Sequence, residues 1–276
     1  MMALNTRTRS KHHRGLNEAR RLAVAPLAAL IVTLAACARV GGIPVAVQPE
    51  RPTVATHAGT VAPGLLEIET GGERDRSARH SYATQVPTVL KFGVTKETQL
   101  SIFTPFLSGP GTAFGPGDFA VGVKWRILTN APILNDFALL PQIKFATGGE
   151  HSTKTTDASL LFISSRILGP VSLDLNAGAT WRSGDGSNAP LTATVWTASA
   201  GMPVHGAFGW VVEVFDYPRT SGPAGNAGTA ALLTGPTYLI RPQLALDAGI
   251  ITPISGPQPH ALYVGLVANV GKLIPR

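Results

Sequence analysis

The sequence predicts an all-β protein, an up-and-down antiparallel transmembrane β-barrel of about 12 strands. Three observations lead to this prediction. Long and short connectors alternate along the chain, the segments between them alternate apolar and polar residues, and the N-terminus has the composition of an export signal.

The connectors between the strand-like segments, which run from about Gly64 to Val270, have two distinct lengths. The long ones are polar and rich in Gly and Pro: Gly71–Ser81, Leu107–Gly117, Thr147–Asp157, Arg182–Leu191, Pro218–Thr229 and Thr252–His260. The short ones are Gly93–Glu97, Leu128–Asn135, Gly169-Pro170, Pro203–Ala207 and Arg241-Pro242. In membrane barrels the short turns face the periplasm and the long loops face outward. We therefore expect the long connectors to be extracellular.

The strand-like segments have a period of two. In Asp118–Ile127 the odd positions are large and apolar, whereas the even positions are small or charged; Asp136–Ala146 and Val171–Arg182 repeat this pattern. Such alternation places the two sets on opposite faces of a sheet, and it also occurs in a half-solvated soluble sandwich. Two segments, Leu160–Ile163 and Ala230–Leu233, are apolar on both faces. Recurrence over the whole chain favours the barrel.

The N-terminus predicts export. Six Lys or Arg residues precede Leu22–Ala36, an apolar stretch too short to span a bilayer comfortably as a helix. Residues 1–36 are therefore interpreted as a signal peptide. Leu34–Cys37 resembles a lipobox, which would make Cys37 the lipidated N-terminus of the mature protein, while Ala36-Cys37-Ala38 also fits ordinary cleavage. Residues 37–62 are expected to be a Pro-rich periplasmic linker, and residues 63–272 the barrel.

Composition excludes several classes of function. The formal charge of +7 falls to +2 once residues 1–36, with six basic residues and one acidic residue, are removed, because 17 basic and 15 acidic residues remain. A nucleic-acid partner is therefore not indicated. Cys37 is the only cysteine and the His residues show no metal-ligand spacing, so we expect no metal, no cofactor and no enzyme activity.

Several stretches resemble a known family. Val86–Thr95, Gly117–Arg126, Leu140–Gly148, Leu246–Gly249 and Val264–Leu266 are similar to the bacterial outer-membrane family labelled "MetA-pathway of phenol degradation", whose members are described as transporters. The resemblance implies an outer-membrane barrel that passes small apolar or aromatic compounds. It also implies membrane lipid, small-molecule cargo and the barrel-assembly machinery as partners.

Charged residues on the polar face of the strands are the candidate lining of the lumen. They are Lys91, Asp118, Lys124, Arg126, Asp136, Lys144, Asp174, Glu213 and Asp247. Two functions remain open: a passive conduit, or a non-transporting barrel that is a structural lipoprotein or a lipid-modifying enzyme at the rim. A barrel of this size is narrower than open porins, so mixed charges in the lumen could close it by pairing.

Overall fold

The computed structural model describes residues 45–76, 81–184, 191–219 and 228–273 of the chain; the expected signal peptide and Cys37 lie outside these residues. The strands are β1 (Leu65–Arg76), β2 (Tyr82–Val86), β3 (Thr88–Gly93), β4 (Thr98–Phe103), β5 (Phe106–Ser108), β6 (Gly115–Pro116), β7 (Ala120–Ala131), β8 (Asn135–Lys144), β9 (Asp157–Leu168), β10 (Val171–Arg182), β11 (Thr192–His205), β12 (Phe208–Arg219), β13 (Thr229–Arg241), β14 (Leu244–Ser255) and β15 (His260–Lys272). A single 3-10 turn, η1, covers Gly149–His151. Among the residues whose structure is described, no helix is long and apolar enough to cross a membrane.

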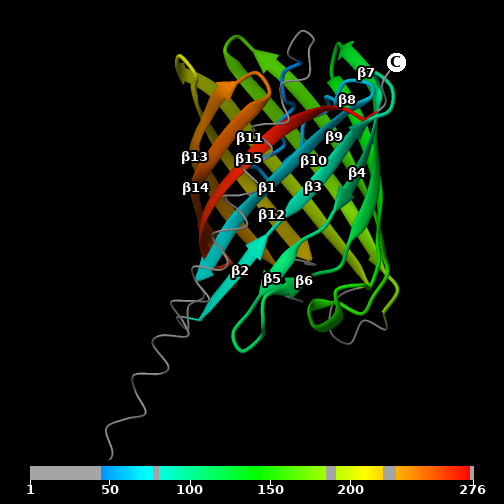
Figure 1. The fold of residues 1–276 in the computed structure, drawn as a ribbon, viewed down its shortest axis with the longest axis vertical. Helices are drawn as coiled ribbons and strands as arrows, with labels where there is room; N and C mark the ends of the chain where they lie inside the picture. The colour runs from blue at the N-terminus through cyan, green and yellow to red at the C-terminus, as the bar shows by residue number, and fades with distance from the viewer. Residues whose placement is uncertain (1–44, 77–80, 185–190, 220–227, 274–276) are drawn as a thin grey trace, which may run out of the picture. The chain divides into compact units, whose positions relative to one another are not determined.

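These strands form one closed antiparallel barrel, which confirms the predicted fold (Figure 1). Consecutive strands pair around the wall, and β1 pairs with β15 from Leu65↔Lys272 to Arg76↔His260 to close it. At three places in the wall, two consecutive strands together make one crossing of the barrel. Proline explains one of these interruptions. Pro87 lies between β2 and β3, and it has no N–H to donate to the ladder. The pairs β2/β3, β4/β5 and β6/β7 therefore count as one barrel strand each, which gives a barrel of twelve strands.

The two ends of the barrel differ as the connector lengths predicted. Short turns gather at the end where β1 begins and β15 ends, and the long connectors gather at the opposite end (Figure 1). Two long connectors are shorter than expected, because β1 continues to Arg76 and β14 continues to Ser255. Hydrogen bonding to β15 and β2 extends β1 past the glycines that had suggested a loop.

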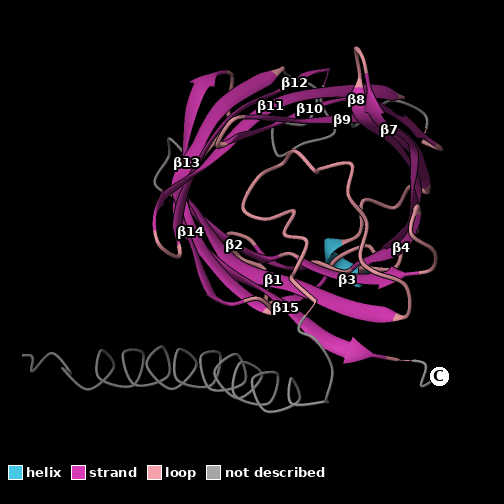
Figure 2. Cartoon of the chain, turned by 90° about the horizontal axis from the view of Figure 1, so that it is seen from above, coloured by secondary structure: helices cyan, strands magenta, loops and turns pink. Residues whose placement is uncertain are grey.

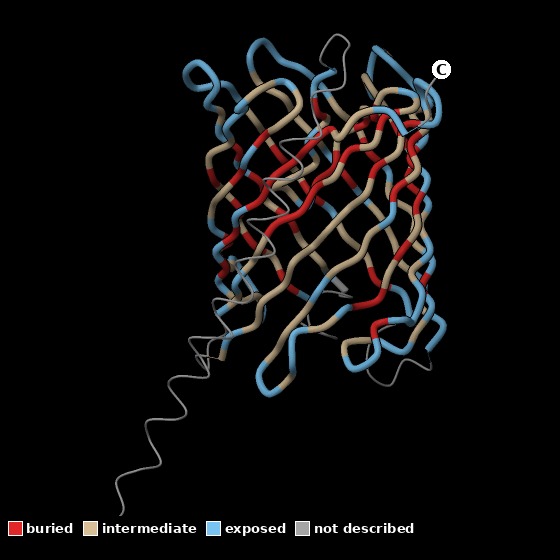
Figure 3. Tube along the Cα trace, in the orientation of Figure 1, coloured by how far each residue is buried: buried red, intermediate tan, exposed pale blue. Residues whose placement is uncertain are grey.

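Buried and exposed residues alternate along many of the strands (Figure 3), and large apolar side chains are among the exposed residues. Side chains such as Trp125, Leu175 and Phe162 are 53%, 54% and 46% exposed on the outer surface, whereas their neighbours Lys124 and Asn176 are buried inside. Solvent exposure of large apolar residues around a closed sheet is the arrangement that a lipid environment covers.

The segments that are apolar on both faces line parts of the interior. Ile163 packs inside against Ala138 and Leu140, and Leu233 belongs to a larger internal cluster with Val211, Phe215, Ala231, Ile251, Ala261 and Tyr263. The interior is therefore not uniformly polar. Its apolar cluster lies in the half of the barrel nearer the long connectors, on β12–β15.

Residues 45–63 run through the inside of the barrel. Seen along the barrel axis, this segment crosses the lumen as a loop that no strand of the wall includes (Figure 2). We call it the inner segment. The sequence predicts a periplasmic linker over residues 37–62; the described part of that range, from residue 45, lies against the inner wall instead.

Candidate functional site in the barrel lumen

The inner segment enters and leaves the barrel at the end with the short turns. At its start the Val47 amide donates to the Pro242 carbonyl in the β13–β14 turn, with an N···O distance of 2.7 Å. At its end the Gly64 amide donates to the Gly93 carbonyl at the end of β3, also at 2.7 Å. The residues between these two points contact the inner faces of strands all around the barrel.

Wall carboxylates hold the backbone of the inner segment. The amides of Gln48 and Glu50 donate to Glu67 and Glu69 of β1, each with an N···O distance of 2.8 Å. On the other side of the lumen, Glu213 of β12 accepts the amides of Val54 at 2.8 Å and Ala55 at 2.6 Å. These hydrogen bonds satisfy backbone amides that have no partner in a strand ladder, so the carboxyl groups anchor a segment that has no regular secondary structure.

Neutral wall residues complete the anchoring. Asn176 of β10 accepts the amide of Thr56 at 2.7 Å and donates to the Thr56 carbonyl at 2.9 Å. The Ala58 amide donates to the Ser165 hydroxyl of β9 at 2.7 Å, and the Val61 amide donates to the Gln99 side chain of β4 at 3.0 Å. Side chains of the wall thus replace the ladder bonds that this buried backbone lacks.

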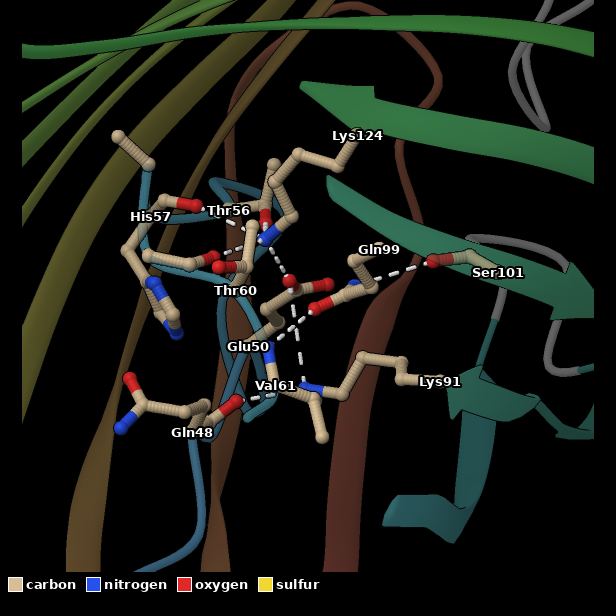
Figure 4. A network of polar contacts seen from close by, with 12 residues as sticks. Gln48, Glu50, Thr56, His57, Thr60, Val61, Lys91, Gln99, Ser101 and Lys124 are labelled. Atoms are coloured by element: carbon tan, nitrogen blue, oxygen red, sulfur yellow. Dashed lines mark hydrogen bonds and ion pairs between the residues drawn. The ribbon is translucent and has the colours of Figure 1, made fainter. Parts of the chain in front are cut away.

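Two buried lysines flank Glu50 of the inner segment (Figure 4). Lys91 of β3 lies 2.7 Å from Glu67 and 2.5 Å from Glu69, measured from its Nζ to their carboxylate oxygens, and 4.0 Å from Glu50. Lys124 of β7 pairs directly with Glu50. Its Nζ also donates to the carbonyls of His57 and Gly59, both at 2.9 Å. Both lysines are fully buried, and Glu50 is the carboxylate paired with Lys124 among the described residues, so removal of the Glu50 charge would leave Lys124 without compensation.

The titratable groups of the inner segment respond to this environment. Burial alone would raise the pKa of Glu50, but the charges of Lys124 and Lys91 outweigh it and hold that pKa far below the usual value. Burial, reinforced by the charge of Lys124, lowers the pKa of His57 to about 3. Glu50 is therefore ionised and His57 neutral when the inner segment is in place at neutral pH.

Arg51 of the inner segment lies against a pair of glycines. Gly71 of β1 and Gly265 of β15 face each other in the ladder, and an added Cβ would lie 2.5 Å from Arg51 Nη2 at Gly71 and 2.3 Å from Arg51 Nε at Gly265. The guanidinium therefore occupies space that a side chain at position 71 or 265 would fill. Arg51 Nη2 reaches Asp247 of β14 at 3.4 Å. A cavity of about 330 Å³ lies beside this pair, lined also by Thr53, Asp174 and Ser199.

The nine candidate lumen residues fall into three groups. Lys91, Lys124, Glu213 and Asp247 contact the inner segment, and Asp174 lines the cavity beside it. Arg126 and Asp136 lie near the short turns, where Arg126 donates to the Lys96 carbonyl and Asp136 accepts the Asn130 amide.

Asp118 and Lys144, the last two candidates, lie near the long connectors. Asp118 pairs with Lys144 at 3.3 Å between Nζ and Oδ2. It also accepts the amides of Thr147 and Gly148, each at 2.9 Å. Burial would raise the pKa of Asp118, but the hydrogen bonds from Gly148 and its neighbours lower it well below the usual range. Asp118 thus fixes the connector that follows β8.

Four charged residues of the site are not among the candidates predicted from the sequence: Glu50 and Arg51 of the inner segment, and Glu67 and Glu69 of the wall. Glu67 and Glu69 stand two residues apart in a strand, so the period of two could have identified them as inward-facing acids. Nothing in the local sequence indicates that Glu50 and Arg51 point into the lumen. Across the described ranges, no group of three or more His, Cys, Asp or Glu residues could hold a metal ion.

Comparisons with known proteins identify solved structures with a similar fold. No family model matches the chain, and no curated protein matches it. Among solved structures, an outer membrane channel from Pseudomonas putida F1 is similar, with a TM-score of 0.60 and 12% identity over 77% of this chain and 97% of that chain. The KdgM porin in complex with disordered oligogalacturonate has a TM-score of 0.51 and 8% identity over 73% of this chain and 98% of that chain. The chain has the fold of outer-membrane channel barrels. At these identities the likeness concerns the fold alone.

Proposed function

We propose that this protein is an outer-membrane channel for small molecules whose lumen is closed by its own inner segment and opens when that segment leaves. The observation that carries the proposal is the way the inner segment is held: wall side chains bind its backbone through hydrogen bonds and its Glu50 and Arg51 side chains through ion pairs. Water can replace such contacts. Val47 and Ala58 are the residues of the described inner segment that join the buried apolar clusters of the wall.

The wall itself does not depend on the inner segment. Each of the twelve barrel strands is hydrogen-bonded to two others, and β1 pairs with β15 along its whole length. Release of residues 45–63 would therefore leave a closed barrel with a polar lumen. The segment remains attached to β1 at the short-turn end, so release would be reversible.

We further propose the finer points that rest on the sequence. The cargo is small and apolar or aromatic, residues 1–36 direct export, the barrel-assembly machinery inserts the barrel, and Cys37 is lipidated. Intact mass of the purified mature protein tests lipidation: a mass beginning at unmodified Arg39 would show ordinary signal cleavage and contradict it.

Glu50→Gln tests the channel function, because it leaves buried Lys124 without its counter-ion. Breaking a buried ion pair costs about 3–5 kcal/mol, which would favour release of the inner segment. In proteoliposome swelling assays we expect Glu50→Gln to admit arabinose faster than the wild type. The matched control is Glu97→Gln, an exposed residue in the β3–β4 turn, which should behave as the wild type.

Aromatic preference is tested in the same vesicles. Phenyl glucoside and methyl glucoside differ only in the aromatic group, and neither crosses lipid readily. Faster swelling with phenyl glucoside than its size predicts would support the proposed cargo. If no solute enters through folded Glu50→Gln, the protein is a non-transporting barrel, the second function that the filled lumen favours.

A further inference from the structure

We infer that the open lumen selects cationic solutes over anionic ones, because release of the inner segment exposes a set of wall charges with a negative sum. This inference rests on the proposed channel function and specifies its cargo. The relevant surface is the ring of wall residues that the inner segment now covers.

The charges of this ring can be counted from its contacts. Four carboxylates touch the inner segment, Glu67, Glu69, Glu213 and Asp247, and two ammonium groups do so, Lys91 and Lys124. Four negative and two positive charges give a formal sum of −2. The inner segment contributes Glu50 and Arg51 to the same contacts, one negative and one positive charge, so its departure leaves this sum unchanged.

Departure of the inner segment does remove the hydrogen-bond and ion-pair partners of the wall carboxylates. With the inner segment in place, Glu213 accepts two backbone amides and Asp247 faces the Arg51 guanidinium. Once it leaves, these oxygens face the solution in the lumen. A narrow passage lined by one sign of charge raises the local concentration of ions of the opposite sign.

The negative charge is also unevenly distributed around the ring. Lys91 of β3 remains beside Glu67 and Glu69 of the neighbouring strand β1, at 2.7 and 2.5 Å, so these carboxylates offset its positive charge. On β12 and β14, Glu213 and Asp247 have no wall lysine in contact among the ion pairs of the described residues. Asp174 lines the cavity beside them. The β10–β14 side of the ring therefore attracts cations most strongly.

Apolar groups adjoin these carboxylates. Val211 and Phe215 flank Glu213 on the inward face of β12, two residues away on either side, and both belong to the internal apolar cluster. A solute that combines a cation with an aromatic body would contact both features. A quaternary ammonium carrying a benzyl group has this chemistry.

The experiment compares two permanently charged aromatic solutes of similar size. Proteoliposomes with folded Glu50→Gln are tested for entry of benzyltrimethylammonium and benzenesulfonate. We expect the cation to enter at least about fivefold faster. Under a tenfold KCl gradient, the reversal potential in planar bilayers should have the sign of a potassium-preferring pore.

Two further variants in the Glu50→Gln background locate the effect. Glu213→Gln and Asp247→Asn should each bring the cation-to-anion ratio closer to one, while Glu150→Gln, in the exposed η1 turn, should leave it unchanged. Heat-modifiable migration on gels shows that each variant is folded, and either variant alone suffices if the other does not fold.

The outcomes separate this inference from the proposed function. Entry of arabinose with equal or faster passage of benzenesulfonate would overturn cation selection and leave the channel intact. A lack of entry by arabinose and by both ions would overturn the channel and the selection together.

Discussion

Gly265 decides whether Arg51 can lie against the wall. The three heavy atoms nearest to an added Cβ all belong to the Arg51 side chain, with Nε at 2.3 Å, whereas at Gly71 the Val264 backbone carbonyl is also among the nearest. We therefore predict that Gly265→Ala leaves the barrel folded but displaces Arg51 from Asp247, so that the inner segment becomes more accessible to protease from the short-turn end. Gly72→Ala is the control, because nothing lies within 4 Å of its added Cβ. Equal cleavage of the two variants would contradict this role of the glycine.

Leu175 tests which face of the wall meets lipid. It is 54% exposed on the outer face of β10, so Leu175→Arg places a charge in the bilayer and should cost about 2–4 kcal/mol if it lies near the midplane. Ile133→Arg, at a residue 86% exposed in the β7–β8 turn, makes a similar change outside the strands and should be tolerated. Urea titration of the barrel in lipid vesicles measures both. A soluble protein would show little cost at either position.

The binding of the inner segment to the wall depends on pH. His57 faces Lys124, Lys91 and Glu50, and with its pKa lowered to about 3 it stays neutral in place, whereas a released His57 binds a proton below about 6.5. The free energy of release therefore becomes more favourable as pH falls below about 6.5, by about 2 kcal/mol at pH 5. Glu50 acts in the same direction below about pH 4.3, since its pKa is lowered in place.

We predict that arabinose entry through the wild type increases between pH 7 and pH 5. His57→Gln should remove this increase and keep the one at lower pH that belongs to Glu50. The measurement is the swelling rate of proteoliposomes at each pH, with Glu97→Gln as a variant that should follow the wild type. A rate that is constant from pH 7 to pH 5 would exclude control by His57.

The elements differ in how far the sequence could predict them. The strands and their faces follow from a period of two, as in Asp118–Ile127, because that pattern is local. The inner segment has no such pattern, and its contacts join residues far apart in sequence, such as Ala55 and Glu213 at a separation of 158. Its prolines predicted an extended chain, but only the closed wall determines that this chain lies inside. Five of the nine candidate residues lie beside the segment, although the sequence could not show what they contact.

The whole barrel has a direction that labelling can measure. We predict that the long-connector end is extracellular, so Lys154→Cys, in the connector before β9, should react with an impermeant maleimide on intact cells. Ile133→Cys, in a short turn at the opposite end, should react only after the outer membrane is opened. The unsubstituted protein controls for Cys37. The reverse pattern would invert the orientation of the barrel and the side from which the inner segment enters.

The closure of the wall by β1 and β15 also sets an order of assembly. The first and last strands of the barrel must meet, so the seam forms only when the final strand is in place. The inner segment binds early strands through Glu67 and Gln99 and late strands through Glu213 and Asp247. Its full set of bonds therefore exists only in a finished barrel. The segment that closes the pore is thus expected to settle last, and a barrel that stalls before completion would stay unsealed.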